Sequence, residues 1–497
     1  MGMILRYRPL TSKMKRHLIG LAAAAIALLV ASFAAVHVIV STQVLRRWVN
    51  TSPDELLLDY ESASSWIPGV IRLHGLTMRG SDRNVQWHFR MEDARISYSL
   101  LGLLHRQFHA THVRAKGLVF RLRERQEKKE LSSAHLSRIP EIPGFSDPPL
   151  PLPTPEPPLP SPEEKRRFWT IYVEDLVADP TPEIWIELYR FRGHARVTGG
   201  FYLHPHDIAR IGPAAVQFVS GDITLGPDEL LLRSANGNVT GVFDPYAPDE
   251  VNGDEIWPRI SGSVKIEGRL EDLRFVNYFL RRSKEPRLSG GSGTTHLSVG
   301  FDHGIGRGRA EIEVGGIHAA YGKRALSGKA SMRIEIPHWD VEHSDMQVSG
   351  SRLDLSDIVT TGPQRGERDW WGHFQISSGR MHNGFDAQAA VFARDARPLY
   401  TLFGVDLPGW AKGILELDGF NATARLRLAR DLVDISDLDA AGGKFHIAGR
   451  YQEKGDLKRG AFLVETGSLV VGVAIDSAGS HLKLIGARKW FRETAAK

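Results

Sequence analysis

The stretch WHFRMEDARISYSL (Trp87–Leu100) decides the fold class of this chain, because its apolar and polar side chains alternate. A period of two is typical of a β-strand that has one buried face and one solvated face. The same alternation precedes this stretch at Ile71 and Leu73, follows it at Leu118 and Phe120, and continues to the C-terminal region. We therefore expect roughly twenty antiparallel strands joined by short turns of Gly, Asp and Asn.

A long apolar run precedes the strands. Leu18–Val40 reads LIGLAAAAIALLVASFAAVHVIV, which is 23 residues without Asp, Glu, Lys, Arg or Pro. About 20 such residues span a bilayer as a helix. The residues before the run include five Lys or Arg and no Asp or Glu, so the N-terminus should lie in the cytoplasm. The alternative is a cleaved signal peptide, for which Ser32–Ala34 offers small residues. In both cases the remainder of the chain is exported.

The predicted fold class is mainly β: one N-terminal transmembrane helix, then a long curled antiparallel sheet with a few short helices. The chain has 497 residues and no cysteine, so an exported protein of this sequence must be stabilised without disulfides. The formal charge of +5 is concentrated after the anchor, where Ile71–Glu130 carries 13 Lys or Arg against 6 Asp or Glu. That segment should face either anionic lipid headgroups or solvent. We expect no nucleic-acid partner, because no binding motif is recognisable.

The composition divides the chain into segments. Between Pro140 and Pro162, 11 of 23 residues are proline, and a charge run precedes them, so this part should be a linker or a surface loop. The predicted segments are a basic cytoplasmic N-terminus (1–17), a transmembrane helix (18–40), a first β segment (41–123), a charged and Pro-rich linker (124–165), a repetitive β region (166–485) and a C-terminal tail (486–497). At the membrane interface we expect Arg16, Arg46, Arg47 and Trp48.

Candidate catalytic and metal sites are weak. His105, His109 and His112 have a spacing that could place them on one helical face, but they lie where a turn leads into a strand. The glycines Gly304, Gly306 and Gly308 lack the Lys-Ser/Thr of a phosphate loop, and no nucleophile elbow is present. We therefore predict no catalytic residues, no metal, no cofactor and no enzymatic activity.

The apolar faces of so many strands must be shielded from water. A sheet of about twenty strands must curl, close or split into sandwiches. One interpretation is one or two ordinary β-sandwiches. The other is a curled sheet whose concave apolar face holds acyl chains, since an exposed apolar surface of that size otherwise promotes aggregation.

Three parts of the sequence together resemble the AsmA-like family, which is grouped with the repeating β-groove, bridge-like lipid-transfer proteins. They are the single N-terminal anchor, the block SASSWIPGVIRLHGLTMRG with the strands after it, and the C-terminal stretch LDAAGGKFHIAGRYQEKGDLKRGAFLVETGSLVVGVAI. Positions that match the opening pattern of the family are Gly69, Leu73, Gly75, Leu76, Leu100, Leu103, Leu104, Gly117 and Leu118. The Pro-rich insert departs from that pattern.

The resemblance implies a single-pass protein of the bacterial inner membrane, with the bulk of the chain in the periplasm. It implies a taco-shaped groove that binds or transfers phospholipid or a related envelope lipid for envelope homeostasis, with no catalytic residues. A protein partner in the inner or outer membrane would complete the route. The predicted groove-lining residues are Ile71, Leu73, Leu76, Trp87, Phe89, Ile96, Tyr98, Leu118, Phe120, Ile171 and Val173. The alternative function is an envelope scaffold or assembly factor that binds a protein partner through closed β-sandwiches.

Overall fold

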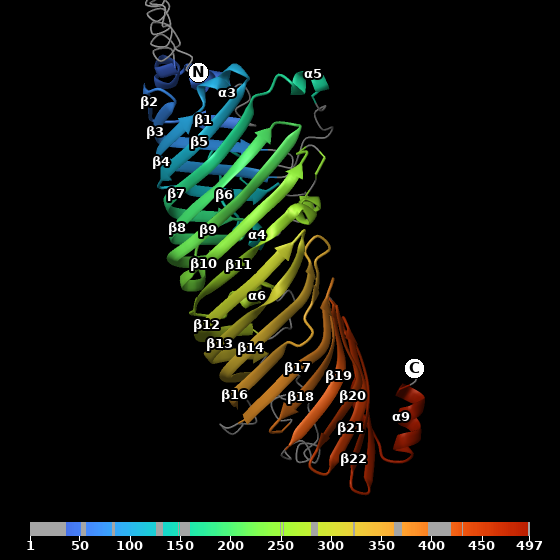
Figure 1. The fold of residues 1–497 in the computed structure, drawn as a ribbon. Helices are drawn as coiled ribbons and strands as arrows, with labels where there is room; N and C mark the ends of the chain where they lie inside the picture. Colours follow the sequence, from blue (N-terminus) through green and yellow to red (C-terminus); the bar gives the residue numbers. More distant parts are fainter. Residues whose placement is uncertain are drawn as a thin grey trace, which may run out of the picture.

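In the computed structural model a single sheet dominates the chain (Figure 1). The structure describes residues 36–50, 56–81, 85–125, 133–147, 149, 160–248, 250–251, 253–279, 287–321, 324–361, 370–395, 419–429 and 431–495. Within these residues it has 24 strands, all in one sheet, and a few short helices. The prediction of a mainly β fold is confirmed.

The strands follow one another along the sheet almost in chain order. Their bounds are β1 Leu56–Asp59, β2 Ser62–Ile67, β3 Val70–Ser81, β4 Val85–Tyr98, β5 Gln107–Lys116, β6 Val119–Glu124, β7 Thr170–Ile186, β8 Tyr189–His204, β9 Ile208–Leu225, β10 Glu229–Tyr246, β11 Ile260–Leu270, β12 Arg287–Asp302, β13 Ile305–Tyr321, β14 Arg324–Asp340, β15 Asp345–Gln347, β16 Arg352–Thr361, β17 Trp370–Met381, β18 Phe385–Ala393, β19 Phe420–Ala429, β20 Leu432–Gly442, β21 Phe445–Lys454, β22 Leu457–Thr466, β23 Leu469–Asp476 and β24 Gly479–Lys483.

The helices are short and lie before, between or after the strands in the chain. They are α2 Val44–Val49, α3 Leu100–Leu104, α4 Ser133–Leu136, α5 Pro162–Lys165, the 3-10 helix η1 Gly253–Arg259, α6 Val276–Phe279 and α9 Ala487–Ala495. Residues 36–41, at the end of the predicted transmembrane run, are also helical. The rest of that run lies outside the described residues. Among the helices that the structure describes, none has the length and apolar character required to cross a bilayer.

The strand ends form two rims. We call the edge where β4 ends and β7 begins the Tyr98 rim, and the opposite edge, where β6 ends, the Glu124 rim. Most connections on the Tyr98 rim are tight, such as the two residues between β12 and β13. The Glu124 rim carries longer connections, including the one that holds α6. The two rims follow from the up-and-down order of the strands, because alternate connections fall on the same edge of the sheet.

One crossover interrupts the antiparallel order. β5 and β6 both pair with β4 on one side, and on the other side both pair with β7 in parallel. The prediction of an antiparallel sheet was therefore incomplete, because the sheet is mixed at this point. Because β7 is parallel to β6, the chain must return from the Glu124 rim, where β6 ends, to the Tyr98 rim, where β7 begins. β7 has 17 residues and is about 56 Å long, which explains why the linker before it must be long.

The linker does not break the sheet, since β4 to β7 are continuous across it. Part of it packs on the polar face instead. Arg79 donates to the carbonyl of Pro143 at 2.9 Å, Arg121 to that of Glu141 at 3.1 Å, and Arg123 to that of Pro140 at 3.0 Å. Three of the basic side chains that follow the predicted anchor thus hold the linker.

Bulges bend the strands and curl the sheet. A first row of irregular positions crosses β3 to β10, and it includes Gly75 (φ 63°), Gly117 (φ 65°) and Ser234 (φ 52°). Further along, Asp357 (φ 53°) interrupts β16 and Asp437 (φ 51°) interrupts β20. A bulge bends its strand and increases the local twist. Figure 1 shows the resulting long curled sheet, with α9 beside the last strands.

Candidate functional site: the apolar face of the sheet

The candidate site is the apolar face of the sheet. Cross-strand pairs place apolar residues opposite one another, for example Ile266 opposite Leu297, Leu297 opposite Ala310, and Ala310 opposite Ile334. The residues between them on each strand, such as Glu267, are charged or polar and point to the other face. The alternation read from the sequence is therefore the pattern of one continuous apolar face.

The predicted lining residues lie on this face at its N-terminal end. Eight of them belong to β3–β6 or to the turn between β5 and β6. Tyr98 is the last residue of β4, and Ile171 and Val173 belong to β7. Ile71, Leu73, Leu76, Tyr98 and Leu118 form one buried core with Met91 and Ala94, and Phe89 and Ile96 pack against it. Val173 and Ile171 belong to a neighbouring cluster, Phe120 packs in a third, and Trp87 stacks on Phe89 at 5.7 Å between ring centroids.

The chain that precedes the sheet covers this end of the apolar face. Val40 and Tyr60 are buried in the same core as Ile71, and Val36 and Leu45 pack against it. The Tyr60 hydroxyl donates to the carbonyl of Val40 at 2.6 Å, and burial raises the pKa of Tyr60. The helical residues 36–41 and α2 are thereby fixed to the first strands.

Beyond this end, many apolar side chains of the central strands are only partly buried, whereas Val299, Val314 and Ile336 are buried. Val264, Ile266, Leu297, Ile312 and Ile334 all keep an intermediate exposure. The connection that contains α6 packs on this stretch through Leu273, Phe275 and Val276. The predicted lining set includes no residue of β11–β14, although their alternation carries the same signal.

Of the four residues predicted at the membrane interface, the structure describes the side chains of Arg46 and Arg47. Arg46 turns back to β1, where its guanidinium lies 3.1 Å from the Asp59 carboxylate and 4.2 Å from the centre of the Tyr60 ring. Arg47 is exposed. Arg16 and the Trp48 side chain lie outside the described residues.

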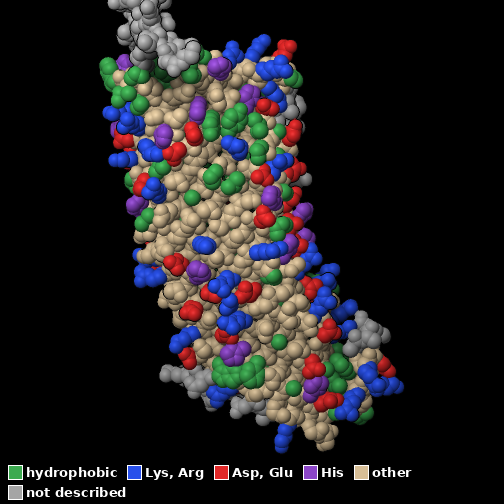
Figure 2. Space-filling view, in the orientation of Figure 1, with side chains coloured by type: hydrophobic (Ala, Val, Ile, Leu, Met, Phe, Trp, Pro, Cys, Tyr) green, Lys and Arg blue, Asp and Glu red, His purple; other side chains and the backbone are tan. Residues whose placement is uncertain are grey.

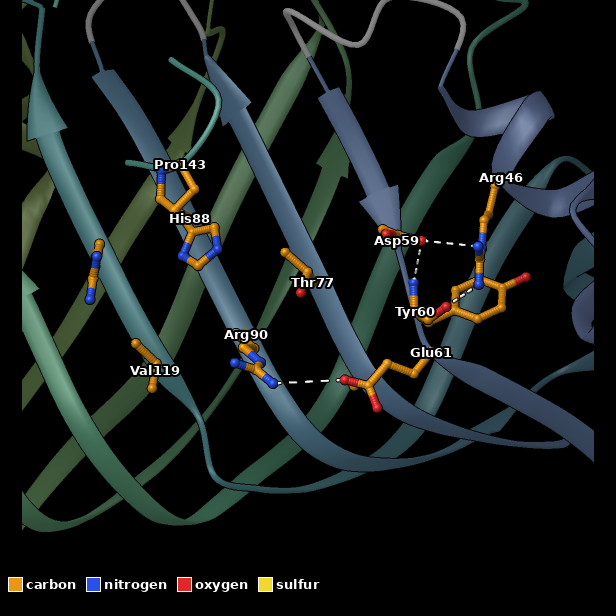
Figure 3. Close-up of a pocket in the computed structure, with 11 residues that line it drawn as sticks. Arg46, Asp59, Tyr60, Glu61, Thr77, His88, Arg90, Val119 and Pro143 are labelled. Carbon is orange, nitrogen blue, oxygen red and sulfur yellow. Dashed lines mark hydrogen bonds and ion pairs between the residues drawn. The ribbon is translucent and has the colours of Figure 1, made fainter. Parts of the chain in front are cut away.

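A polar cavity of about 690 Å³ lies on the opposite face near the same end (Figure 3). It is lined by Arg46, Asp59, Tyr60, Glu61, Gly75, Thr77, His88, Arg90, Val119, Arg121 and Pro143. His88 is 93% buried, since 7% of it is exposed, and its Nδ1 has no hydrogen-bond partner among the described residues. Burial, reinforced by the charges of Arg121, Arg79 and Arg90, lowers the pKa of His88 to about 4. The imidazole is therefore neutral at pH 7. The cavity holds arginines beside this neutral ring, and Asp59 and Glu61 lie 3.1 Å from Arg46 and 3.8 Å from Arg90.

The histidines considered as metal ligands have separate partners. The His109 ring lies 3.1 Å from Glu174, His112 lies 3.3 Å from the Thr111 hydroxyl, and His105 lies 3.1 Å from the Leu101 carbonyl. Among the described residues, the one group of three potential ligands is Asp340, Glu342 and His343, with His343 exposed at a turn. Its His343 and Asp340 side chains already form an ion pair at 2.9 Å.

Comparisons with family models, with curated proteins and with solved structures found no match for this chain.

Proposed function

We propose that the protein binds or transfers phospholipid, or a related lipid, along the apolar face of its sheet, without catalysing a reaction. The single observation that carries this proposal is the exposure of that face. Side chains such as Ile266, Ile312 and Ile334 would be fully buried in a closed sandwich core. Here each remains partly exposed across the central strands.

The size of the surface supports an acyl chain as its occupant. Five neighbouring strands, β10 to β14, contribute apolar positions in register, and each is 11 to 18 residues long. A monomeric protein rarely leaves a contiguous apolar surface of that extent in water. An acyl chain needs no hydrogen bonds, so it fits a face that offers few polar groups.

We further propose that the protein is attached to a membrane through the predicted helix 18–40 and acts on the exported side. The apolar run leads into residues 36–41, which lie at the covered N-terminal end of the sheet, so lipid would enter the apolar face beyond that cover. The proposed occupant is then close to a bilayer, which is its source or its destination.

The test is lipid retention by the full chain. The protein is extracted in mild detergent, and bound lipid is quantified by native mass spectrometry and lipid extraction. Leu297→Glu places a charge on the apolar face, and Ser298→Glu places the same charge on the opposite face of the same strand. We expect Leu297→Glu to lose most of the bound lipid and Ser298→Glu to retain it.

Ile334→Glu with Ser331→Glu as its control repeats the comparison on β14. Circular dichroism and thermal unfolding establish that each variant is folded. Equal retention by the paired variants, or no bound lipid in the unaltered chain, would contradict the proposal. The second result, combined with capture of a protein partner, would favour the scaffold function.

A further inference from the structure

Large apolar side chains gather at the N-terminal end of the Tyr98 rim. Trp66 is 80% exposed, Leu101 is 72% exposed and Leu104 is 79% exposed. Around them lie further exposed apolar residues, and we call the whole set the rim patch: Trp66, Ile67, Leu100, Leu101, Leu104, Phe168 and Trp169.

Backbone hydrogen bonds bring the three parts of the rim patch together. The Tyr98 N–H donates to the Gly69 carbonyl at 2.7 Å, which places the β2–β3 turn beside the end of β4. The Thr170 N–H donates to the Arg106 carbonyl at 3.0 Å, which places Phe168 and Trp169 beside the connection that contains α3. The patch is therefore one edge of neighbouring strands, although its residues span more than 100 positions in the sequence.

These residues do not serve the core. The helix α3, with sequence LLGLL, buries none of its residues. Several other connections on the same rim are polar, such as His303–Gly304, His382–Gly384 and Gly455–Asp456. On the Tyr98 rim, exposed apolar residues in connections are thus concentrated where the chain enters the sheet, although Leu484 and Ile485 are exposed before α9 at the other end of the chain.

Cations border the rim patch. Arg106, Arg166 and Arg167 are exposed, and Arg106 donates to the Arg167 carbonyl at 3.4 Å. Acidic residues nearby include Glu163 and Glu164 of α5, and Glu164 closes the capping box with Ser161. Asp207 is also near, since it follows His206, whose ring centroid lies 5.3 Å from that of Phe168. Figure 2 shows hydrophobic, His and Lys/Arg side chains together at this end of the molecule. Trp with Arg beside apolar residues is the composition of a membrane–water interface.

The patch also lies where the apolar run meets the sheet. The Trp66 ring lies 4.1 Å from that of His37, and the Ser65 N–H donates to His37 Nδ1 at 3.3 Å. The apolar run Leu18–Val40 leads directly into this contact. A bilayer that holds the run would therefore be next to Trp66.

We infer that the rim patch inserts into the headgroup region of the bilayer and seats this end of the sheet on the membrane surface. Trp66, Leu101 and Trp169 enter the interface, and Arg106, Arg166 and Arg167 contact anionic headgroups. The inference goes beyond the proposed function, because a sheet that carried no lipid would still be seated in this way. A tether alone would let the rim leave the surface.

The absence of cysteine allows a direct test on the full chain. Single variants Leu101→Cys and Trp169→Cys carry the fluorophore NBD, and the protein is reconstituted in vesicles of equal parts phosphatidylethanolamine and phosphatidylglycerol. Leu457→Cys is the matched control, because Leu457 is 64% exposed on the same rim at the far end of the sheet. Lipids with a doxyl spin label on the acyl chain serve as quenchers.

We expect labels at 101 and 169 to lose about half of their fluorescence or more, and the label at 457 to lose little. Replacing Arg106, Arg166 and Arg167 with Gln should reduce quenching in these vesicles. Equal quenching at all three labels, or none at 101 and 169, would overturn the inference. The second result is the one expected of a protein-binding patch. Repeating the measurement with Leu297→Glu separates the two proposals, since quenching at 101 should persist when lipid retention by the sheet is lost.

Discussion

Arg123 and Asp147 form an ion pair at 3.0 Å that joins the sheet to the Pro-rich linker. The Arg123 side chain is completely buried, and its guanidinium also donates to Gln86 and to the carbonyls of Pro140 and Ser146. Burial lowers the pKa of Arg123, but the pair and these acceptors keep its charge compensated. Arg123 of β6 thus fixes the path of the linker, although the Pro-rich composition of the linker suggests no fixed structure.

Asp147→Asn should release the linker from the sheet. The change leaves a buried guanidinium without its counter-ion, and because Asp147 is half exposed we expect a loss of about 1–2 kcal/mol in the free energy of unfolding. Limited proteolysis should cut the linker faster. Asp302→Asn is the control, because the Asp302 side chain is 86% exposed, and it should change neither measurement. Unchanged proteolysis of Asp147→Asn would mean that the pair does not hold the linker.

His88 should make the protein less stable in acid. Its pKa is about 4 in the folded chain against 6.5 for an ordinary histidine, so folding favours the neutral ring. Its contribution is fully present above pH 6.5 and is lost as the pH falls towards 4, by about 2–3 kcal/mol. Unfolding of the unaltered chain and of His88→Gln, measured at intervals from pH 7 to pH 4, should show a difference that changes over this range. A difference that is constant with pH would contradict the assignment.

Gly293 should not tolerate a side chain. A Cβ at this position would lie 1.8 Å from the Glu313 carbonyl oxygen, so the two strands would have to separate. We expect Gly293→Ala to cost about 2–4 kcal/mol. Gly241 is also a strand glycine, but a Cβ there would meet nothing within 4 Å, so Gly241→Ala should stay within about 1 kcal/mol of the unaltered chain. Similar thermal unfolding of both variants would argue against the close approach of β12 and β13.

Asn277 should hold α6 on the apolar face. Its side-chain amide donates to the Leu288 carbonyl at 2.7 Å, and its Oδ1 accepts from the Leu288 N–H at 2.8 Å. Asn277→Ala removes both bonds, and we expect a local loss of about 1–2 kcal/mol. Hydrogen exchange followed by mass spectrometry should show faster exchange in residues 273–279. The exposed Asn421→Ala on β19 should leave this segment unchanged, and so a change in both variants would indicate a global effect.

The sequence was sufficient to predict the β fold, because period-two alternation forces one face of each strand into an apolar environment. It also predicted the shared face of residues such as Trp87 and Phe89, since parity along a strand determines the side on which a residue lies. The position of a long loop between Glu124 and Thr170 was visible in its prolines, which cannot take part in a central sheet.

Only the tertiary structure showed that β7 runs parallel to β5 and β6, because strand direction depends on where the linker returns and not on the alternation itself. The same holds for the buried Arg123, which the sequence places on a solvated face and the linker covers. The rim patch could not be predicted either. Backbone hydrogen bonds between distant segments bring Trp66, Leu101 and Trp169 to the same rim, and apolar residues in connections carry no periodicity that would signal it. Local pattern determines which face a residue occupies, whereas long-range pairing decides which residues become neighbours.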